Sequence, residues 1–247
     1  MVKYLITLLL LLTPSLSLFG APAVVQTATN YCYDTTCTVS FGANTAAGNL
    51  IVVTGYAYYN SGADTTATGW TDTPTNFTYA TGNTDIMVVS AESNHSTQST
   101  IWYRANAPAT SSITASVTTA STNVLLIALE ISGVVTTTPL NQVSQSITQG
   151  GTGVPFAATP TFSVTPVIAV SMVTNSMGFG TVWGGGETAY NNPLGGQSVG
   201  VEQHASGAAY TAAATVDDTA TYIMLSGTTA TFTAAAAPTN SMLMASD

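Results

Sequence analysis

The hydrophobic and polar positions of this 247-residue chain recur in short runs that are typical of β-strands. The longest alternating run covers residues 49–59. Its even positions Leu50 and Val52 lie on one face of the expected strand, and its odd positions Ile51 and Val53 lie on the other. Because both sets are apolar, we expect this strand to be buried on both faces.

Two further segments, residues 124–131 and 166–173, are apolar on both faces, which predicts strands covered on both sides. Gly, Asn, Pro and Ser separate these segments from shorter runs that are rich in Thr, Val, Ile and Tyr, the residue types that favour strands. The other expected strands are residues 24–29, 38–41, 86–90, 100–105, 112–118, 197–203, 208–214, 221–225, 229–233 and 241–245.

The spacing of these strands predicts an all-β fold, because no stretch of the chain has the periodicity of an amphipathic helix. Many short strands with short connections favour a single β-sandwich, jelly-roll-like and mostly antiparallel. No linker-like segment divides residues 24–247, and the weakest point is residues 149–153. We therefore expect one domain.

Residues 1–23 have the pattern of a secretory signal peptide. Lys3 supplies the charged start, residues 5–12 supply the apolar core, and Ala21-Pro22-Ala23 fits the small-x-small cleavage rule. The apolar run is much shorter than the roughly 20 residues that span a bilayer. We expect cleavage before Val24 and a mature protein without a membrane span, secreted to the extracellular space or the cell surface.

The charge content excludes one class of function. Charged residues make up 5% of the chain, whereas a soluble domain usually has about 25%. Loss of Lys3 with the leader would take the formal charge from −9 to −10 and leave Arg104 as the only basic side chain. Nucleic-acid binding needs a basic surface, so the mature chain is not expected to bind DNA or RNA.

The two cysteines, Cys32 and Cys37, are close in the sequence. Export favours a disulfide between them, and the residues 33–36 can form the turn that brings two antiparallel arms together. A zinc site is the alternative, but two cysteines without a nearby histidine make a poor one. We expect a disulfide that pins one hairpin.

Several framework segments resemble a β-sandwich module that is common in secreted and cell-surface bacterial proteins. These segments are Thr38-Val-Ser-Phe41, Ala47-Gly-Asn-Leu-Ile-Val-Val53, Ile101-Trp-Tyr103, Leu125-Leu-Ile-Ala-Leu-Glu-Ile-Ser-Gly133 and Pro139-Leu140. The resemblance implies a β-sandwich and export, and it assigns no catalytic residue. In composition, the lysine-poor chain is also similar to the donor-strand-linked subunits of archaeal surface threads and pili.

The side chains that carry chemistry are scattered. The two histidines, His95 and His204, are both interpreted as solvent-exposed. The chain has 11 carboxylate side chains and nothing in their spacing selects an acid–base pair. There is no Gly-x-Ser-x-Gly nucleophile motif either. We expect a protein that is not an enzyme, with no catalytic residue, no metal and no cofactor.

The sequence suggests two kinds of interaction with sugars, glycan binding and N-glycosylation. Trp183 lies in a glycine-rich segment and is the best candidate for an exposed ring that stacks on a glycan; the alternative is that the aromatic residues fill the core. Asn76 and Asn94 each begin an Asn-x-Ser/Thr sequon and are candidates for N-glycosylation in an exported protein.

These features favour a non-enzymatic extracellular structural protein, the self-assembling subunit of a surface filament or layer, whose partners are copies of itself. A sheet edge without lysine can accept a strand from a neighbour. The candidate donor strand consists of Val24, Val25, Gln26, Thr27, Ala28 and Thr29. The segment has a second interpretation, as the first strand of its own domain. The alternative function is a secreted adhesin that binds surface glycans.

Overall fold

The computed structural model describes residues 21–59, 70–72, 77–79, 86–89, 96–117, 123–149, 167–175, 181–184, 186–191, 197–204, 210–216 and 224–236. Every regular element in these residues is a β-strand, and every strand pair is antiparallel, which confirms the predicted fold class. Residues 1–20 of the expected leader lie outside the described residues. So do Asn76, Asn94, His95 and the expected strand at residues 241–245.

The described strands form four sheets. The six-stranded sheet has the order β1-β9-β3-β7-β5, with β6 also paired to β7. Its strands are β1 (Ala23–Cys32), β3 (Leu50–Tyr59), β5 (Thr78–Tyr79), β6 (Ile86–Val89), β7 (Ser96–Arg104) and β9 (Asn123–Ser132). The five-stranded sheet has the order β10-β16-β11-β14-β13. Its strands are β10 (Leu140–Gln149), β11 (Val167–Asn175), β13 (Thr188–Asn191), β14 (Gln197–His204) and β16 (Met224–Thr233).

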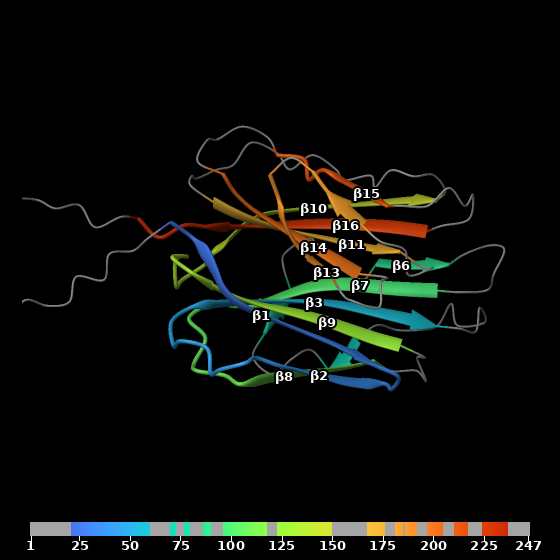
Figure 1. Cartoon of the computed structure of the whole chain (residues 1–247), viewed down its shortest axis with the longest axis horizontal. Coiled ribbons are helices and arrows are strands. Elements are labelled where there is room, and N and C mark those ends of the chain that lie inside the picture. The colour runs from blue at the N-terminus through green and yellow to red at the C-terminus, as the bar shows by residue number, and fades with distance from the viewer. Residues whose placement is uncertain are drawn as a thin grey trace, which may run out of the picture.

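Two smaller sheets complete the described part. One contains β2 (Thr36–Ser40), β8 (Ser112–Val117) and β4 (Trp70–Asp72), and the other contains β12 (Thr181–Trp183) and β15 (Ala214–Val216). The six- and five-stranded sheets pack face to face as a sandwich, with β2 and β8 below it and β15 above it in Figure 1. Both large sheets are therefore covered on their outer faces as well.

The alternation in β3 has the predicted consequence. Leu50 and Val52 pack in the core between the two large sheets, whereas Ile51 and Val53 pack in the core between the six- and three-stranded sheets. In β9, every residue except the first and the last is buried, as predicted for a strand covered on both faces. The two central strands thus supply apolar side chains to both cores and join the three layers.

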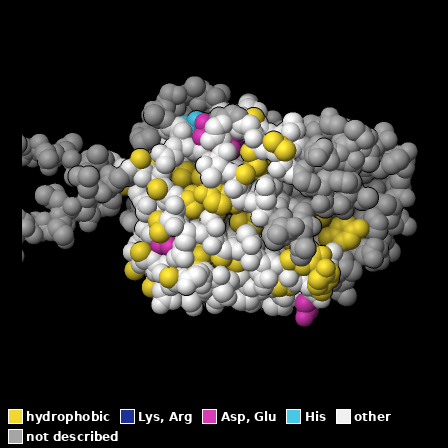
Figure 2. Space-filling view, in the orientation of Figure 1, with side chains coloured by type: hydrophobic (Ala, Val, Ile, Leu, Met, Phe, Trp, Pro, Cys, Tyr) yellow, Lys and Arg dark blue, Asp and Glu magenta, His cyan; other side chains and the backbone are white. Residues whose placement is uncertain are grey.

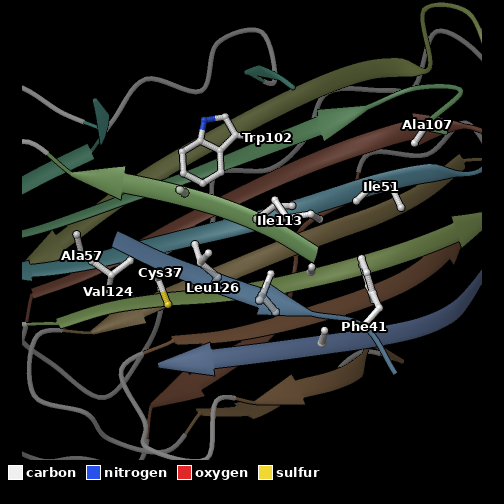
Figure 3. Close-up of a cluster of buried hydrophobic side chains, with 14 residues drawn as sticks. Cys37, Phe41, Ile51, Ala57, Trp102, Ala107, Ile113, Val124 and Leu126 are labelled. Carbon is white, nitrogen blue, oxygen red and sulfur yellow. The ribbon is translucent and has the colours of Figure 1, made fainter. Parts of the chain in front are cut away.

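The core between the six- and three-stranded sheets is drawn in Figure 3. Trp102 of β7 lies above Ile51, Ile113 and Leu126, and its side chain is fully buried. Phe41 closes the cluster at the far end. A buried indole and several branched aliphatic side chains thus form a second apolar core beneath the six-stranded sheet.

Several segments differ from the predicted strands. The described parts of the expected strands at residues 221–225 and 229–233 belong to one strand, β16, which runs through Gly227. Of the expected strand at residues 208–214, the described residues 210–214 contain only a bridge at Tyr210 and Ala214, the first residue of the short β15. The sequence reasoning missed β10, because its Asn, Gln and Ser residues lack an apolar alternation.

Candidate functional site

β1 forms one edge of the six-stranded sheet and contains the segment expected to be a donor strand. In the structure it pairs with β9 of the same chain, from Ala23 opposite Ser132 to Cys32 opposite Val124. It is thus the first strand of its own domain, the second of the two interpretations. Within the described part of the chain, β9 is the only strand that pairs with β1. Among the described strands none is hydrogen-bonded through its backbone to the other edge of β1, although β2 packs next to β1 and is joined to it by the Asn30 side chain and the Cys32–Cys37 disulfide.

A bulge lies near the start of β1. The pairing register shifts between Val24 and Gln26, so Val25 has no direct partner on β9 and its side chain is 54% exposed. At the other end of the strand, Tyr33 is 78% exposed and its ring packs edge-on against Tyr31, with the ring centres 4.7 Å apart. Burial raises the pKa of Tyr31 to about 12, and the contact with Tyr33 adds to the shift. Apolar surface is therefore exposed at both ends of β1.

The buried carboxylate of Glu130 on β9 anchors the first half of β1. Its Oε2 accepts a hydrogen bond from the Gln26 side-chain amide at 2.7 Å. Its Oε1 accepts from the Ala46 backbone N–H at 2.7 Å and from the Asn49 side-chain amide at 2.6 Å. Glu130 is 1% exposed, and these three donors take the place of the cation that usually accompanies a buried carboxylate.

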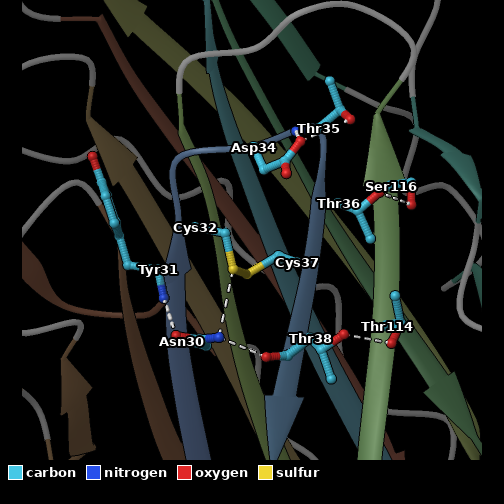
Figure 4. The surroundings of a disulfide bond; sticks show 10 residues. All are labelled: Asn30, Tyr31, Cys32, Asp34, Thr35, Thr36, Cys37, Thr38, Thr114 and Ser116. Carbon is cyan, nitrogen blue, oxygen red and sulfur yellow. Dashed lines mark hydrogen bonds between the residues drawn. A yellow bond between two sulfur atoms is a disulfide. The ribbon is translucent and has the colours of Figure 1, made fainter.

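The predicted disulfide between Cys32 and Cys37 is confirmed and holds the second end of β1 (Figure 4). It closes the turn that leads from β1 into β2, with Cys37 fully buried in the core below. Next to it, the Asn30 side-chain amide donates to the backbone carbonyl of Thr38 at 2.6 Å. The hydroxyls of Thr38 and Thr114 share a hydrogen bond at 2.7 Å, which ties β2 to β8.

A groove of about 220 Å³ lies where the start of β1 passes the edge of the five-stranded sheet. Val24, Ile168 and Val201 supply apolar surface, and Tyr190 and Glu202 supply a phenol ring and a carboxylate. Figure 2 shows hydrophobic side chains gathered in the middle of this face, with few acidic side chains and no lysine or arginine in view. The groove and the open edge of β1 thus adjoin on one weakly charged side of the sandwich.

A second group of polar side chains lies on the outer face of the five-stranded sheet. The Tyr210 hydroxyl and the Ala213 backbone N–H each donate to Oε1 of Glu187 at 2.8 Å. His204 Nε2 lies 3.6 Å from Glu202 Oε2, and the ring centres of His204 and Tyr210 are 4.2 Å apart. The interpretation of His204 as solvent-exposed is therefore wrong: its side chain is 19% exposed, because the Tyr210 ring packs against it.

Burial shifts the ionisation of this group. It raises the pKa of the Glu202 carboxyl, and the negative charge of Glu187 raises it further. Burial lowers the pKa of His204, while the charge of Glu187 opposes that shift. The pKa of Tyr210 is raised, chiefly by burial, so its hydroxyl stays protonated and acts as a donor to Glu187. The group contains two carboxylates and one histidine, and it is coupled electrostatically.

Trp183, the candidate for stacking on a glycan, is partly buried on the same outer face. Its indole N–H donates to Ser198 Oγ at 2.5 Å. Its ring lies against Gly200 so closely that a Cβ at that position would fall 2.5 Å from Trp183 Cε3. This contact covers one side of the indole, so any sugar would have to meet the ring from the other side.

The described residues hold no group of three His, Cys, Asp or Glu side chains that could bind a metal ion. They also include no helix that is long and apolar enough to cross a membrane. No protein-family model, curated protein or solved structure matches the chain. The assignment of a function therefore depends on the open edge, the groove and the charge distribution.

Proposed function

We propose that this chain is a non-enzymatic extracellular structural protein that assembles with copies of itself into a surface filament or layer. The observation that carries the proposal is β1, a ten-residue edge strand without a charged residue or a proline. Natural sheet proteins usually block such an edge with lysine, proline or a covering segment. Here the bulge at Val25 disturbs only the start of the strand.

The charge of the chain supports assembly. Two copies approaching through β1 would bring no charged side chain of that strand together. A row of backbone hydrogen bonds, each worth about 0.5–1.5 kcal/mol net, would supply much of the attraction. Because the contact would use backbone groups and apolar side chains rather than ion pairs, high salt should not dissociate it.

The covalent structure favours edge pairing over strand donation as the mode of assembly. Only residues 33–35 connect β1 to β2, and the Cys32–Cys37 disulfide closes that connection. A donated β1 would have to leave its own β9 while β2 stays paired with β8. With the disulfide intact, β1 and β2 can move only as one hairpin, so β1 cannot leave its own sheet alone and be donated to a neighbour. A neighbouring copy would instead pair with the edge of β1.

The test is the state of the purified protein that begins at Val24. Light scattering after size-exclusion chromatography, over about a hundredfold range of concentration, should show a mass that rises with concentration. Electron microscopy of negatively stained samples should show filaments or sheets. A monomer at every concentration, in high and low salt, would refute the proposal.

A second candidate function, a secreted adhesin that binds glycans, is supported by the groove. Tyr190 could stack on a sugar ring, while Glu202 and Thr188 could accept or donate hydrogen bonds to its hydroxyls. A glycan array tests this function directly. Binding that is lost in Tyr190→Ala/Thr188→Ala and kept in Thr137→Ala, an exposed position outside the groove, would favour the adhesin.

A further inference from the structure

Two of the large hydrophobic side chains that are exposed in the described residues lie at opposite ends of β1. Val25 is 54% exposed near the start of the strand, and Tyr33 is 78% exposed just after its end. The bulge turns Val25 out of the regular pairing with β9. Tyr31 packs against Tyr33, so the second end presents two neighbouring phenol rings.

We infer that two copies of this chain join edge to edge through β1, antiparallel and about a two-fold axis near Ala28. The inference rests on the proposed self-assembly and names one of its interfaces. An antiparallel pairing of identical strands is self-complementary, since each contact occurs twice. With Ala28 opposite its own copy, Val25 of one chain faces Tyr31 of the other.

This arrangement covers the exposed apolar groups at both ends of the strand. Cross-strand pairs of an aromatic and a β-branched side chain are among the favourable ones in antiparallel sheets. The pair of Val25 with the Tyr31–Tyr33 rings would form twice, once at each end of the contact. Between them, Thr27 of one copy faces Thr29 of the other, and no charged residue lies in the paired segment.

Contacts within the single chain fix the position of β1 before a second copy binds. Glu130 binds the side chain of Gln26, and Asn30 binds the backbone of β2. The Cys32–Cys37 disulfide closes the end of the strand, and the Gln203 side-chain amide donates to the backbone carbonyl of Pro22 at its beginning. A strand fixed at both ends loses little conformational freedom on pairing, which favours association.

A second copy is a better occupant of this edge than an unrelated strand. The two ends of β1 are complementary to each other, valine to tyrosine, only when the partner runs antiparallel and carries the same residues. The side of the sandwich that flanks β1 is also weakly charged (Figure 2), so copies of this acidic chain meet there with little repulsion. A two-fold contact makes a dimer, and a filament or layer would need one more interface.

The experiment compares Val25→Lys with Thr137→Lys in the oxidised protein that begins at Val24. Both variants add one lysine at an exposed position, and Thr137 lies in the connection between β9 and β10, outside β1. Sedimentation velocity should show that Val25→Lys weakens self-association by about tenfold or more. Thr137→Lys should change it by less than about twofold. Near-ultraviolet circular dichroism checks that both variants stay folded.

A cross-linking measurement tests the register. An equimolar mixture of Thr27→Cys and Thr29→Cys proteins should form a disulfide-linked dimer under mild oxidation, because these positions face each other across the axis. Each variant alone should form less. If the protein associates but Val25→Lys leaves the association unchanged and the mixture does not cross-link, the β1 contact is refuted and the proposed assembly stands. If the unmodified chain never associates, both are refuted.

Discussion

Glu130 and the pair Glu187 and Glu202 are two ways of burying carboxylates in a chain with almost no cations. Glu130 lies between sheets and accepts hydrogen bonds from three N–H donors. Glu187 and Glu202 lie on an outer face, where they share one histidine and one tyrosine. The first site holds the edge strand β1 in place, and we call it the clamp; in the second site burial raises the pKa of Glu202 and lowers the pKa of His204.

The difference has a structural cause. Glu130 occupies a position on β9 whose neighbours supply directed donors, so its charge is compensated locally. On the outer face the covering segments are short, and the carboxylates are only half-buried. We expect loss of the clamp to lower the free energy of unfolding strongly, and substitutions in the outer group to have small effects that depend on pH.

The largest effect is expected for Glu130→Ala. The substitution leaves the Gln26 and Asn49 side-chain amides and the Ala46 backbone N–H without their acceptor. Since a hydrogen bond to a charged group contributes about 1.5–3 kcal/mol, we expect the free energy of unfolding to fall by about 3 kcal/mol or more. Chemical denaturation measures the loss.

Glu130→Gln is the matched control for that substitution. It keeps the size and one acceptor oxygen, so it should cost less than Glu130→Ala. Hydrogen exchange should show the added opening in β1, which Glu130 holds through Gln26. Equal and small losses in both variants, below about 0.5 kcal/mol, would show that the clamp does not stabilise the fold.

Gly200→Ala tests the packing of the outer face. A Cβ at this position would lie 2.5 Å from Trp183 Cε3, so the indole would have to move. We expect a loss of about 1–3 kcal/mol, the usual cost of overpacking. At Gly184 the nearest atom to an added Cβ would be the Ala213 Cβ at 3.7 Å. Gly184→Ala is therefore a control that should change the free energy of unfolding little.

The sequence predicted the parts of the molecule that alternation and burial determine. The two faces of β3 and the full burial of β9 were predictable, because their apolar residues leave one arrangement. The disulfide was predictable from spacing and export. The short strands β12 and β15 were not, since three residues carry no readable pattern.

The site was less predictable than the fold. The sequence indicated that Val24–Thr29 is either a donated strand or the first strand of its own domain, and both interpretations fit the same residues. The clamp by Glu130 was not predictable, because an acidic residue within an apolar run does not reveal its donors, and all three donors lie more than 80 residues away in the sequence. The burial of His204 was not predictable, because the Tyr210 ring that packs against it lies outside any regular strand.

Loss of the disulfide should have an intermediate effect on the end of β1. Removing the cross-link in Cys32→Ala/Cys37→Ala frees a short loop in the unfolded chain, which by loop-closure entropy costs about 2 kcal/mol of stability. The variant should stay folded, because Asn30 still joins β1 to β2. Mass spectrometry of the unreduced parent protein should detect no thiol that can be alkylated at Cys32 or Cys37. Two free thiols would contradict the structure.

The smallest expected effect is the pH dependence of the outer group. The pKa of His204 lies below the usual histidine value of 6.5 in the folded protein. The unfolded chain therefore binds a proton at a higher pH than the folded chain does. The contribution of His204 to stability is present above pH 6.5 and is lost as the pH falls through the lower, folded pKa. Glu202 acts in the opposite sense, because its pKa is raised above 4.5. Its contribution is present below that value and is lost as the pH rises through the folded pKa.

His204→Gln separates the two contributions. Between about pH 7 and pH 5, the melting temperature of the unsubstituted protein should fall relative to that of His204→Gln, with a difference in free energy under about 1 kcal/mol. The groups that face His204 are Glu202, Tyr210 and, through its charge, Glu187, so Glu187→Gln should deepen the fall by removing the charge that supports protonation. Glu130→Gln should leave the slope of this difference unchanged, because Glu130 belongs to the clamp on β1. If the melting temperatures of the unsubstituted protein and His204→Gln change equally with pH across this range, protonation of His204 does not contribute to the pH dependence of stability, and the prediction is wrong.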